Sequence, residues 1–202
     1  MVASARITAA VKNKERLIQL FEEGGLPWET TSMLGCKAAE GLTKLDANNE
    51  AIRVLEELEK RFPKSVRPRQ LHALALARRA ENDDLTRAQD ILGELYALGK
   101  RDPETLGIYA RTWMDRYAKS GDINDLKQSR DYYIEPFTAG QDDYYTDINA
   151  AAKSVFIGTP DDLNRAATYA ELVQEIVGTS PHADDYWKTA TRGGSASDSK
   201  EV

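Results

Sequence analysis

Two pairs of polar residues in this sequence lie one helical turn apart and carry groups that bind charged partners. Arg111 and Asp115 are four residues apart, and so are Asn149 and Lys153. Residues at this spacing share one face of an α-helix, so each pair presents its polar groups together. Arginine and lysine bind carboxylate or phosphate groups through charge-assisted hydrogen bonds. The two pairs therefore predict a surface that binds an anionic group.

Two further residues complete the predicted site. Arg78 belongs to a group of arginines, and Tyr145 belongs to a group of aromatic residues around one turn. Such rings either pack between neighbouring helices or form a platform for a peptide or a ring-bearing ligand, and both interpretations stay open. The predicted binding residues are Arg78, Arg111, Asp115, Tyr145, Asn149 and Lys153. The expected occupant is a protein partner or peptide segment, and the alternative is a small anionic or nucleotide-like ligand.

Paired aspartates are the residues that most resemble a metal or acid–base site. They stand at 83–84, 142–143, 161–162 and 184–185, each at the start of a predicted helix. Aspartate at a helix start caps free N–H groups and favours the positive end of the helix dipole. No glycine-bearing calcium loop surrounds any pair. We interpret the pairs as helix caps.

Other catalytic or metal-binding patterns are missing from the sequence. Cys36, His72 and His182 are the only cysteine and histidines, too few for a structural zinc site. The sequence contains no phosphate-binding loop, zinc-protease motif or nucleophile elbow. We expect no metal, no cofactor and no enzymatic activity.

Composition limits the partners and the compartment. The 202 residues carry a net charge of −6, so a general affinity for nucleic acid or an anionic membrane surface is not expected. A single cysteine forms no intrachain disulfide, which favours a reducing compartment. No run of about 18 apolar residues occurs to span a membrane. These features predict a cytoplasmic protein.

The elements that must position the site are predicted to be helices. In residues 104–119 the apolar residues recur every three or four positions, which is typical of one buried stripe. We expect this stripe to contain Leu106, Tyr109, Trp113 and Tyr117. For residues 145–157 the expected buried set is Ile148, Ala152, Val155 and Phe156. Further helices are predicted over residues 7–23, 27–42, 51–62, 69–81, 85–98, 125–135, 163–177 and 184–192. Pro136 should end or kink its helix within one turn of Glu135, because proline removes a backbone hydrogen bond.

A repeated phrase indicates that the helices form a tandem array. Asp84-Leu85-Thr86-Arg87-Ala88 returns in similar form at residues 125–129 and 162–166, at spacings of 41 and 37 residues. A helix pair of about this length is typical of tetratricopeptide repeats, whose period is about 34 residues. The predicted fold is an all-α solenoid of about 3.5 stacked helical hairpins, whose first helices line a concave surface. We expect an N-terminal capping helix in residues 1–25, the repeat domain in 26–192 and a flexible tail in 193–202.

Three segments carry a closer resemblance. They read DPETLGIYARTWMDRY at 102–117, DDYYTDINAAA at 142–152 and DYWKTAT at 185–191. Together they resemble the tetratricopeptide-like TRAFs-binding region of apoptosis signal-regulating kinases and the bacterial repeat proteins similar to it. The resemblance implies a non-catalytic regulatory scaffold in a signalling or defence complex. It extends to the helix positions Arg111, Asp115, Asn149 and Trp187. We expect Trp187 to pack on the helix at 163–177.

Overall fold

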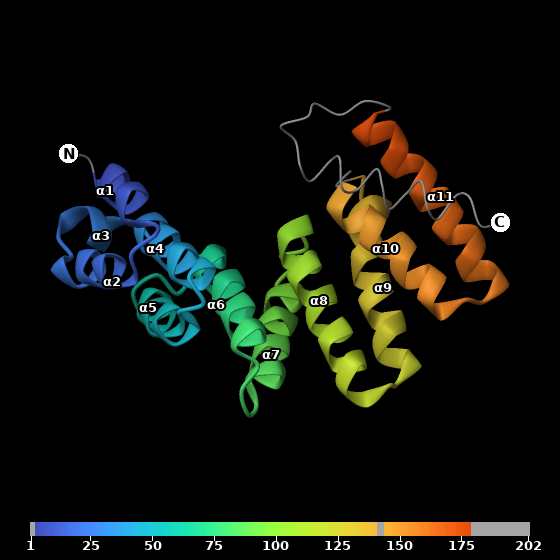
Figure 1. Ribbon diagram of the computed structural model, residues 1–202, viewed down its shortest axis with the longest axis horizontal. Helices are drawn as coiled ribbons and strands as arrows, with labels where there is room; N and C mark the ends of the chain where they lie inside the picture. Colours follow the sequence, from blue (N-terminus) through green and yellow to red (C-terminus); the bar gives the residue numbers. More distant parts are fainter. Residues whose placement is uncertain (1–2, 141–143, 179–202) are drawn as a thin grey trace. The chain divides into compact units, whose positions relative to one another are not determined.

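The computed structural model describes residues 3–140 and 144–178, and it confirms the predicted all-helical fold. Every regular element in these two ranges is a helix. The chain divides into two compact units, Met1–Lys100 and Arg101–Val202. The helices of each unit are labelled in Figure 1.

The first unit is built from consecutive antiparallel helices that pack on their sequence neighbours. α4 packs on α5, α5 on α6 and α6 on α7, while α4 also contacts α6. The apolar stripe of α5 is fully covered, because Ala51, Leu55 and Leu58 are at most 1% exposed. The helices are α1 (Ala3–Ala10), α2 (Lys14–Glu23), α3 (Leu26–Thr30), α4 (Met33–Lys44), α5 (Asn48–Arg61), α6 (Val66–Arg79) and α7 (Asp84–Ala97).

The single helix predicted over residues 7–23 is wrong, because the segment contains two helices. α1 ends at Ala10 and α2 begins at Lys14. Between them Asn13 adopts an extended backbone, and its Oδ1 accepts a hydrogen bond from the Arg16 N–H at 2.7 Å. The apolar stripe runs through both helices, so periodicity alone did not indicate the break. The N-cap side chain ends the first helix and starts the second.

The helix predicted over residues 27–42 is likewise divided. α3 ends at Thr30 and α4 begins at Met33, with Thr31 in an extended conformation between them. The Oγ1 atom of Thr31 accepts a hydrogen bond from the Met33 N–H at 3.2 Å. A threonine hydroxyl that bonds the backbone in this way competes with helix formation.

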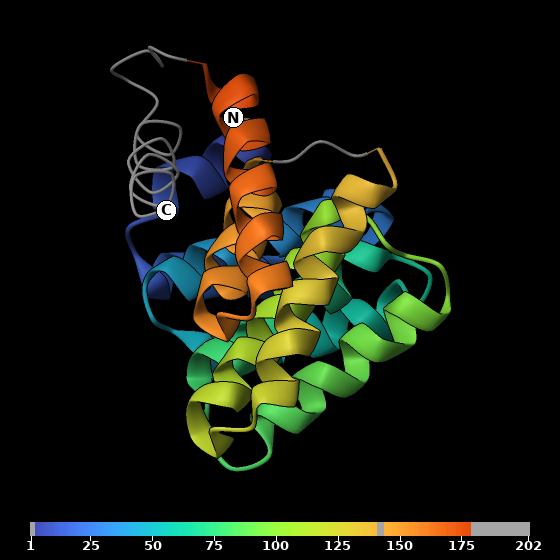
Figure 2. The same ribbon diagram turned by 90° about the vertical axis from the view of Figure 1, so that its right-hand side faces the viewer.

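The second unit contains two hairpins. α8 packs on α9, α9 on α10 and α10 on α11, an order that can be followed in Figures 1 and 2. The core between them includes Ala110 of α8, Tyr133 of α9 and Ala150 of α10, all at most 1% exposed. The helices are α8 (Pro103–Ser120), α9 (Ile123–Thr138), α10 (Tyr144–Ile157) and α11 (Pro160–Val177).

The start of α8 follows the sequence prediction, while its stripe is buried only in part. Asp102 caps the helix by accepting a hydrogen bond from the Thr105 N–H at 3.1 Å. Leu106 and Tyr109 are buried. Trp113 and Tyr117 are only partly covered. The buried face of α8 therefore narrows towards its C-terminal end.

The buried face predicted for α10 is wrong. Phe156 is 70% exposed and Val155 is 40% exposed. Small residues face the core in their place, with Ala150, Ala151 and Ser154 fully buried. α10 packs against both α9 and α11, and small side chains allow helices to approach on two sides. The sequence prediction assumed that the large apolar side chains of α10 face the core. The packing of α10 against both α9 and α11 instead favours small side chains on its buried face.

Pro136 lies inside α9, which ends two residues later at Thr138. This end falls within one turn of Glu135 and confirms the predicted effect of the proline. The backbone N–H of Ala139 donates to the Glu135 carbonyl at 3.1 Å and closes the last turn. The next residue, Gly140, has a positive φ of 71° and leads the chain out of the helix.

The repeated phrase has a structural explanation in three buried aspartates. Asp84, Asp125 and Asp162 lie in the first turns of α7, α9 and α11 and are at most 5% exposed. Each carboxylate forms an ion pair with an arginine of an earlier helix. The pairs are Arg79–Asp84, Arg116–Asp125 and Arg130–Asp162. We refer to them as the arginine–aspartate clasps. The interpretation of these aspartate pairs as helix caps is wrong for the N-cap positions. Asp83 forms no side-chain cap on α7, and the side chain of Thr159 caps α11. Asp84 and Asp162 lie in the first turns of these helices, and their main role is the tertiary ion pair.

Some predictions concern residues outside the described ranges. They are the helix at 184–192, the packing of Trp187, the flexible tail at 193–202 and two aspartate pairs. The division into an N-terminal cap at 1–25, a repeat domain at 26–192 and a tail stays a prediction.

Candidate functional site

Five of the six predicted site residues lie together in the second unit, on two helices that approach each other. At Gly107 of α8, a Cβ atom would lie 3.7 Å from the Tyr145 ring and 3.9 Å from Thr146 of α10. The candidate site lies on the faces of α8 and α10 that carry these residues, beside the buried ring of Tyr133. We define the α8–α10 cluster as Arg111, Asp115, Tyr133, Tyr145, Asn149 and Lys153.

Arg111 and Asp115 form the α8 half of the cluster. The Arg111 Nε donates to Asp115 Oδ1 at 2.9 Å, the pairing expected from their spacing. The arginine side chain stays 63% exposed. The hydrogen bond that Arg111 donates to Asp115 is the largest cause that raises the pKa of Arg111, so the guanidinium remains charged. A partner can therefore still reach a cation whose position is held by its own helix.

Asn149 and Lys153 form the α10 half. The Lys153 ammonium donates to Asn149 Oδ1 at 2.9 Å, and the Asn149 Nδ2 donates to the Tyr145 carbonyl at 2.8 Å. The ammonium also lies over the Tyr133 ring, 5.3 Å from the ring centroid. These contacts hold the lysine side chain along α10 and place its ammonium over the Tyr133 ring of α9.

The charge on Lys153 is not neutralised within the described part of the second unit. No carboxylate there forms an ion pair with it, and Asp115 is paired with Arg111. Burial, and secondly the charge of Arg111, lower the pKa of Lys153 to about 8. A half-buried cation beside a second cation is unfavourable until an anion approaches. The α8–α10 cluster therefore has the electrostatics of an anion-binding surface.

The aromatic group around the α9–α10 turn serves several purposes. Tyr133 is 1% exposed and belongs to the core, while Tyr145 is 49% exposed and meets it edge to face at 6.3 Å. Tyr132 packs against Tyr109 at 4.3 Å, and Phe137 packs against Tyr169 at 5.7 Å. Core packing is thus the main role of the group, and Tyr145 is the ring that the α8–α10 cluster exposes.

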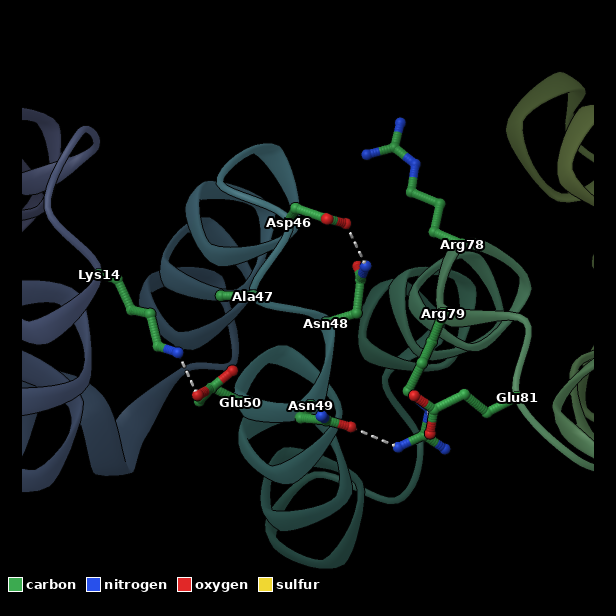
Figure 3. A pocket seen from close by; sticks show the side chains of 9 residues that line it. All are labelled: Lys14, Asp46, Ala47, Asn48, Asn49, Glu50, Arg78, Arg79 and Glu81. Atoms are coloured by element: carbon green, nitrogen blue, oxygen red, sulfur yellow. Dashed lines mark hydrogen bonds and ion pairs between the residues drawn. The ribbon is translucent and has the colours of Figure 1, made fainter.

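The sixth predicted residue, Arg78, lies in the first unit and lines a cavity of about 350 Å³ (Figure 3). Three segments form its walls: the start of α2, the loop and first turn of α5, and the end of α6. We call it the α5 cavity. It is lined by Lys14, Asp46, Ala47, Asn48, Asn49, Glu50, Arg78, Arg79 and Glu81.

Sequence reasoning missed two contributors to these sites. Tyr133 was identified as one of several aromatic residues, but nothing in its spacing indicated that it underlies Lys153. Asp46 was not singled out, because it lies between the helices predicted over residues 27–42 and 51–62. Its backbone has a φ of 58°, a conformation that aspartate tolerates better than most residues. An aspartate directly before a helix start was the available signal.

The described residues contain neither a metal-binding cluster nor a membrane-spanning helix. No group of three or more His, Cys, Asp or Glu side chains there could hold a metal ion. None of the helices in the same residues is long and apolar enough to cross a membrane.

Comparison with known proteins identifies the family. A family model described as Tetratricopeptide Repeats-Sensor (TPR-S) matches residues 47–154, more than half of the chain. The chain belongs to the TPR-S family. This match includes α5 to α9 and most of α10, and therefore the whole α8–α10 cluster.

A solved structure agrees with the TPR-S fold. A thermophilic TPR protein of Thermus thermophilus superposes with a TM-score of 0.61 at 18% identity, covering 95% of this chain and 93% of that one. At this identity the likeness concerns the fold alone, an α-solenoid of tetratricopeptide type. No curated protein matches the chain. The TPR-S family and the fold support a protein-interaction or sensor module in general.

Proposed function

We propose that this TPR-S protein is a non-catalytic regulatory scaffold whose α8–α10 cluster binds an acidic segment of a protein partner. The observation that carries the proposal is the half-buried Lys153, beside Arg111 and without a carboxylate of its own in the described residues. A carboxylate from a partner would neutralise this charge.

The position of the cluster supports a peptide or protein ligand. Arg111 and Lys153 come from the first helices of two successive hairpins, and in tetratricopeptide arrays these helices line the surface that receives extended partners. The exposed Tyr145 adds an aromatic contact of the kind that contributes strongly at protein interfaces. The α8–α10 cluster, with its two cations and the exposed ring of Tyr145, therefore matches a short acidic segment of a protein partner.

The setting is a signalling or defence complex in the cytoplasm. Support comes from the resemblance to the TRAFs-binding region of apoptosis signal-regulating kinases, whose motif positions include Arg111, Asp115 and Asn149. The single cysteine agrees with a reducing compartment.

Affinity capture from native lysate, followed by mass spectrometry, tests the proposal when wild type is compared with two variants. Arg111→Glu reverses the exposed charge, and Lys153→Met removes the half-buried charge while it keeps a long side chain. Each variant should reduce capture of the same acidic partner at least about tenfold, which corresponds to about 1.4 kcal/mol.

Arg165→Glu is the matched control, because Arg165 is an exposed arginine of α11 outside the cluster. It should leave capture unchanged. Full capture by both cluster variants, with melting temperatures like that of wild type, would refute the proposal.

A second candidate is a sensor for a small anionic or nucleotide-like ligand at the same cluster. The family description, which names a sensor, favours it. Direct titration of the purified chain with small anions separates the two candidates. Saturable binding that Lys153→Met abolishes, together with no captured protein, would favour the sensor.

A further inference from the structure

The α5 cavity is polar, and most of its charges are paired with one another. The Lys14 ammonium lies 2.5 Å from Glu50 Oε1. Arg79 binds Asp84, donates to Asn49 Oδ1 at 2.8 Å and lies 3.8 Å from Glu81. These contacts pair the charges in the lower part of the cavity with one another, so no ligand is needed to neutralise them (Figure 3).

Two opposite charges in the same cavity remain apart. Arg78 is exposed, and within the described residues its guanidinium takes part in no hydrogen bond or ion pair. The Asp46 carboxylate accepts one hydrogen bond, from Asn48 Nδ2 at 2.9 Å, and forms no ion pair in the same part of the chain. Figure 3 shows both groups on the same side of the cavity, with no interaction drawn between them. The cavity thus presents a cation and an anion at separate positions.

Asn48 adds a buried acceptor next to the anion. It is 5% exposed and lines the cavity, and its Oδ1 has no hydrogen-bond partner among the described residues. A buried acceptor without a donor is unfavourable, and a donor that reaches it is correspondingly favoured. An ammonium group carries three N–H donors, enough to reach both Asn48 and Asp46.

We propose that the α5 cavity binds a free α-amino acid, with its carboxylate on Arg78 and its ammonium group on Asp46 and Asn48. A simple anion would be repelled by Asp46, and a simple cation would be repelled by Arg78. A zwitterion satisfies both charges and the unpartnered Asn48 acceptor. The volume of about 350 Å³ lies at the lower end of the range for small-molecule sites. This site is separate from the α8–α10 cluster, so the two proposals stand or fall independently.

Calorimetric titration of the full chain with each of the common L-amino acids tests this assignment. Concentrations up to about 10 mM detect dissociation constants near 1 mM. At least one amino acid should bind saturably. Its N-acetyl derivative lacks the ammonium group and its decarboxylated amine lacks the carboxylate, so each should bind at least about tenfold more weakly to the wild-type chain.

Two substitutions locate the site. Asp46→Asn removes the charge, keeps an acceptor for Asn48 and tolerates the left-handed backbone. Arg78→Gln removes the cation. Each should weaken binding at least about tenfold. Arg61→Gln, which alters an exposed arginine paired with Glu57 at the opposite end of α5, should have no effect.

Three results would overturn the assignment. One is the absence of binding by every amino acid at the highest concentration. Another is equal binding of the N-acetyl derivative, which would identify a carboxylate site only. The third is unchanged binding by both variants, which would place the ligand elsewhere. The analogues act on the wild-type chain, so the test does not depend on how well the variants fold.

Discussion

The guanidinium group of Arg79 binds both carboxylate oxygens of Asp84, with Nε 2.7 Å from Oδ2 and Nη2 2.6 Å from Oδ1. The Glu81 N–H adds a third hydrogen bond to Oδ2 at 3.0 Å. Asp84 is 1% exposed, so this clasp closes the turn between α6 and α7 away from water.

Loss of the Asp84 charge should destabilise the chain strongly. Asp84→Ala removes the bidentate partner of Arg79 in a largely buried position, and we expect the free energy of unfolding to fall by about 3 kcal/mol. Urea denaturation measures the change. The neighbouring Asp83 is exposed and forms no side-chain cap, so Asp83→Ala should change stability by less than about 0.5 kcal/mol. Equal effects of the two substitutions would contradict the clasp.

Stability should also depend on pH through the same carboxylate. The hydrogen bonds from Arg79 are the largest cause that lowers the pKa of Asp84. A carboxyl with a lower pKa in the folded state stabilises the fold above its unfolded pKa of about 3.9, and this contribution is lost as the pH falls. Acid titration of unfolding should therefore be less steep for Asp84→Asn than for wild type below about pH 4. Titration curves of equal steepness for wild type and Asp84→Asn would contradict this contribution of Asp84.

Partner capture should weaken in mildly alkaline solution. Burial and the charge of Arg111 lower the pKa of Lys153 to about 8, so the ammonium loses its proton as the pH rises above that value. An acidic partner raises this pKa on binding, and capture should therefore be strong at about pH 7 and decline towards about pH 9.5. Burial raises the pKa of Tyr133, so that phenol stays neutral in this range. Lys153→Met should give weak capture that does not change with pH, and a decline that persists in this variant would assign the titration to another group.

The face of α10 can be tested by stability alone. Phe156 is 70% exposed, so Phe156→Ser should change the free energy of unfolding by less than about 0.5 kcal/mol. Ala151 is fully buried, and Ala151→Leu should destabilise by about 1–3 kcal/mol through overpacking. Thermal unfolding of both variants measures these changes in stability. A larger loss of stability in Phe156→Ser than in Ala151→Leu would support the buried face that was predicted from the sequence.

Cys36 should be unreactive in the folded chain. Its side chain is 4% exposed, and burial is the largest cause that raises the pKa of its thiol to about 11. Thiolate is the reactive form, so a thiol reagent at about pH 8 should label the native chain far more slowly than the denatured chain. Labelling at equal rates would show that α4 opens readily.

The sequence predicted the helices of the repeats well because their signals are local. Apolar spacing, Asp102 as a cap and Pro136 as a terminator each act within one or two turns. The breaks in residues 7–23 and 27–42 were missed because Asn13 and Thr31 interrupt stripes that continue on both sides. Such breaks depend on one side-chain hydrogen bond, which periodicity does not report.

The candidate sites were predictable only in part for a different reason. Arg111, Asp115, Asn149 and Lys153 were found because each pair lies on one helix. The buried Tyr133 under Lys153 comes from a third helix, and only tertiary packing brings them together. Asp46 and Arg78 lie 32 residues apart, and no spacing rule connects a loop with the end of α6.

The third arginine–aspartate clasp, Arg130–Asp162, joins the final hairpin to α9. Arg79 and Arg116 bind aspartates of the next helix, whereas Arg130 of α9 binds Asp162 of α11, across the intervening α10. Arg130 is 8% exposed, and its second partner Asp131 lies largely in solvent. A chain cut after α9 would lose both the helix that packs on α9 and the counter-ion of Arg130. The final hairpin is therefore joined to α9 by an ion pair as well as by packing, and its removal would expose the Arg130 side chain to water.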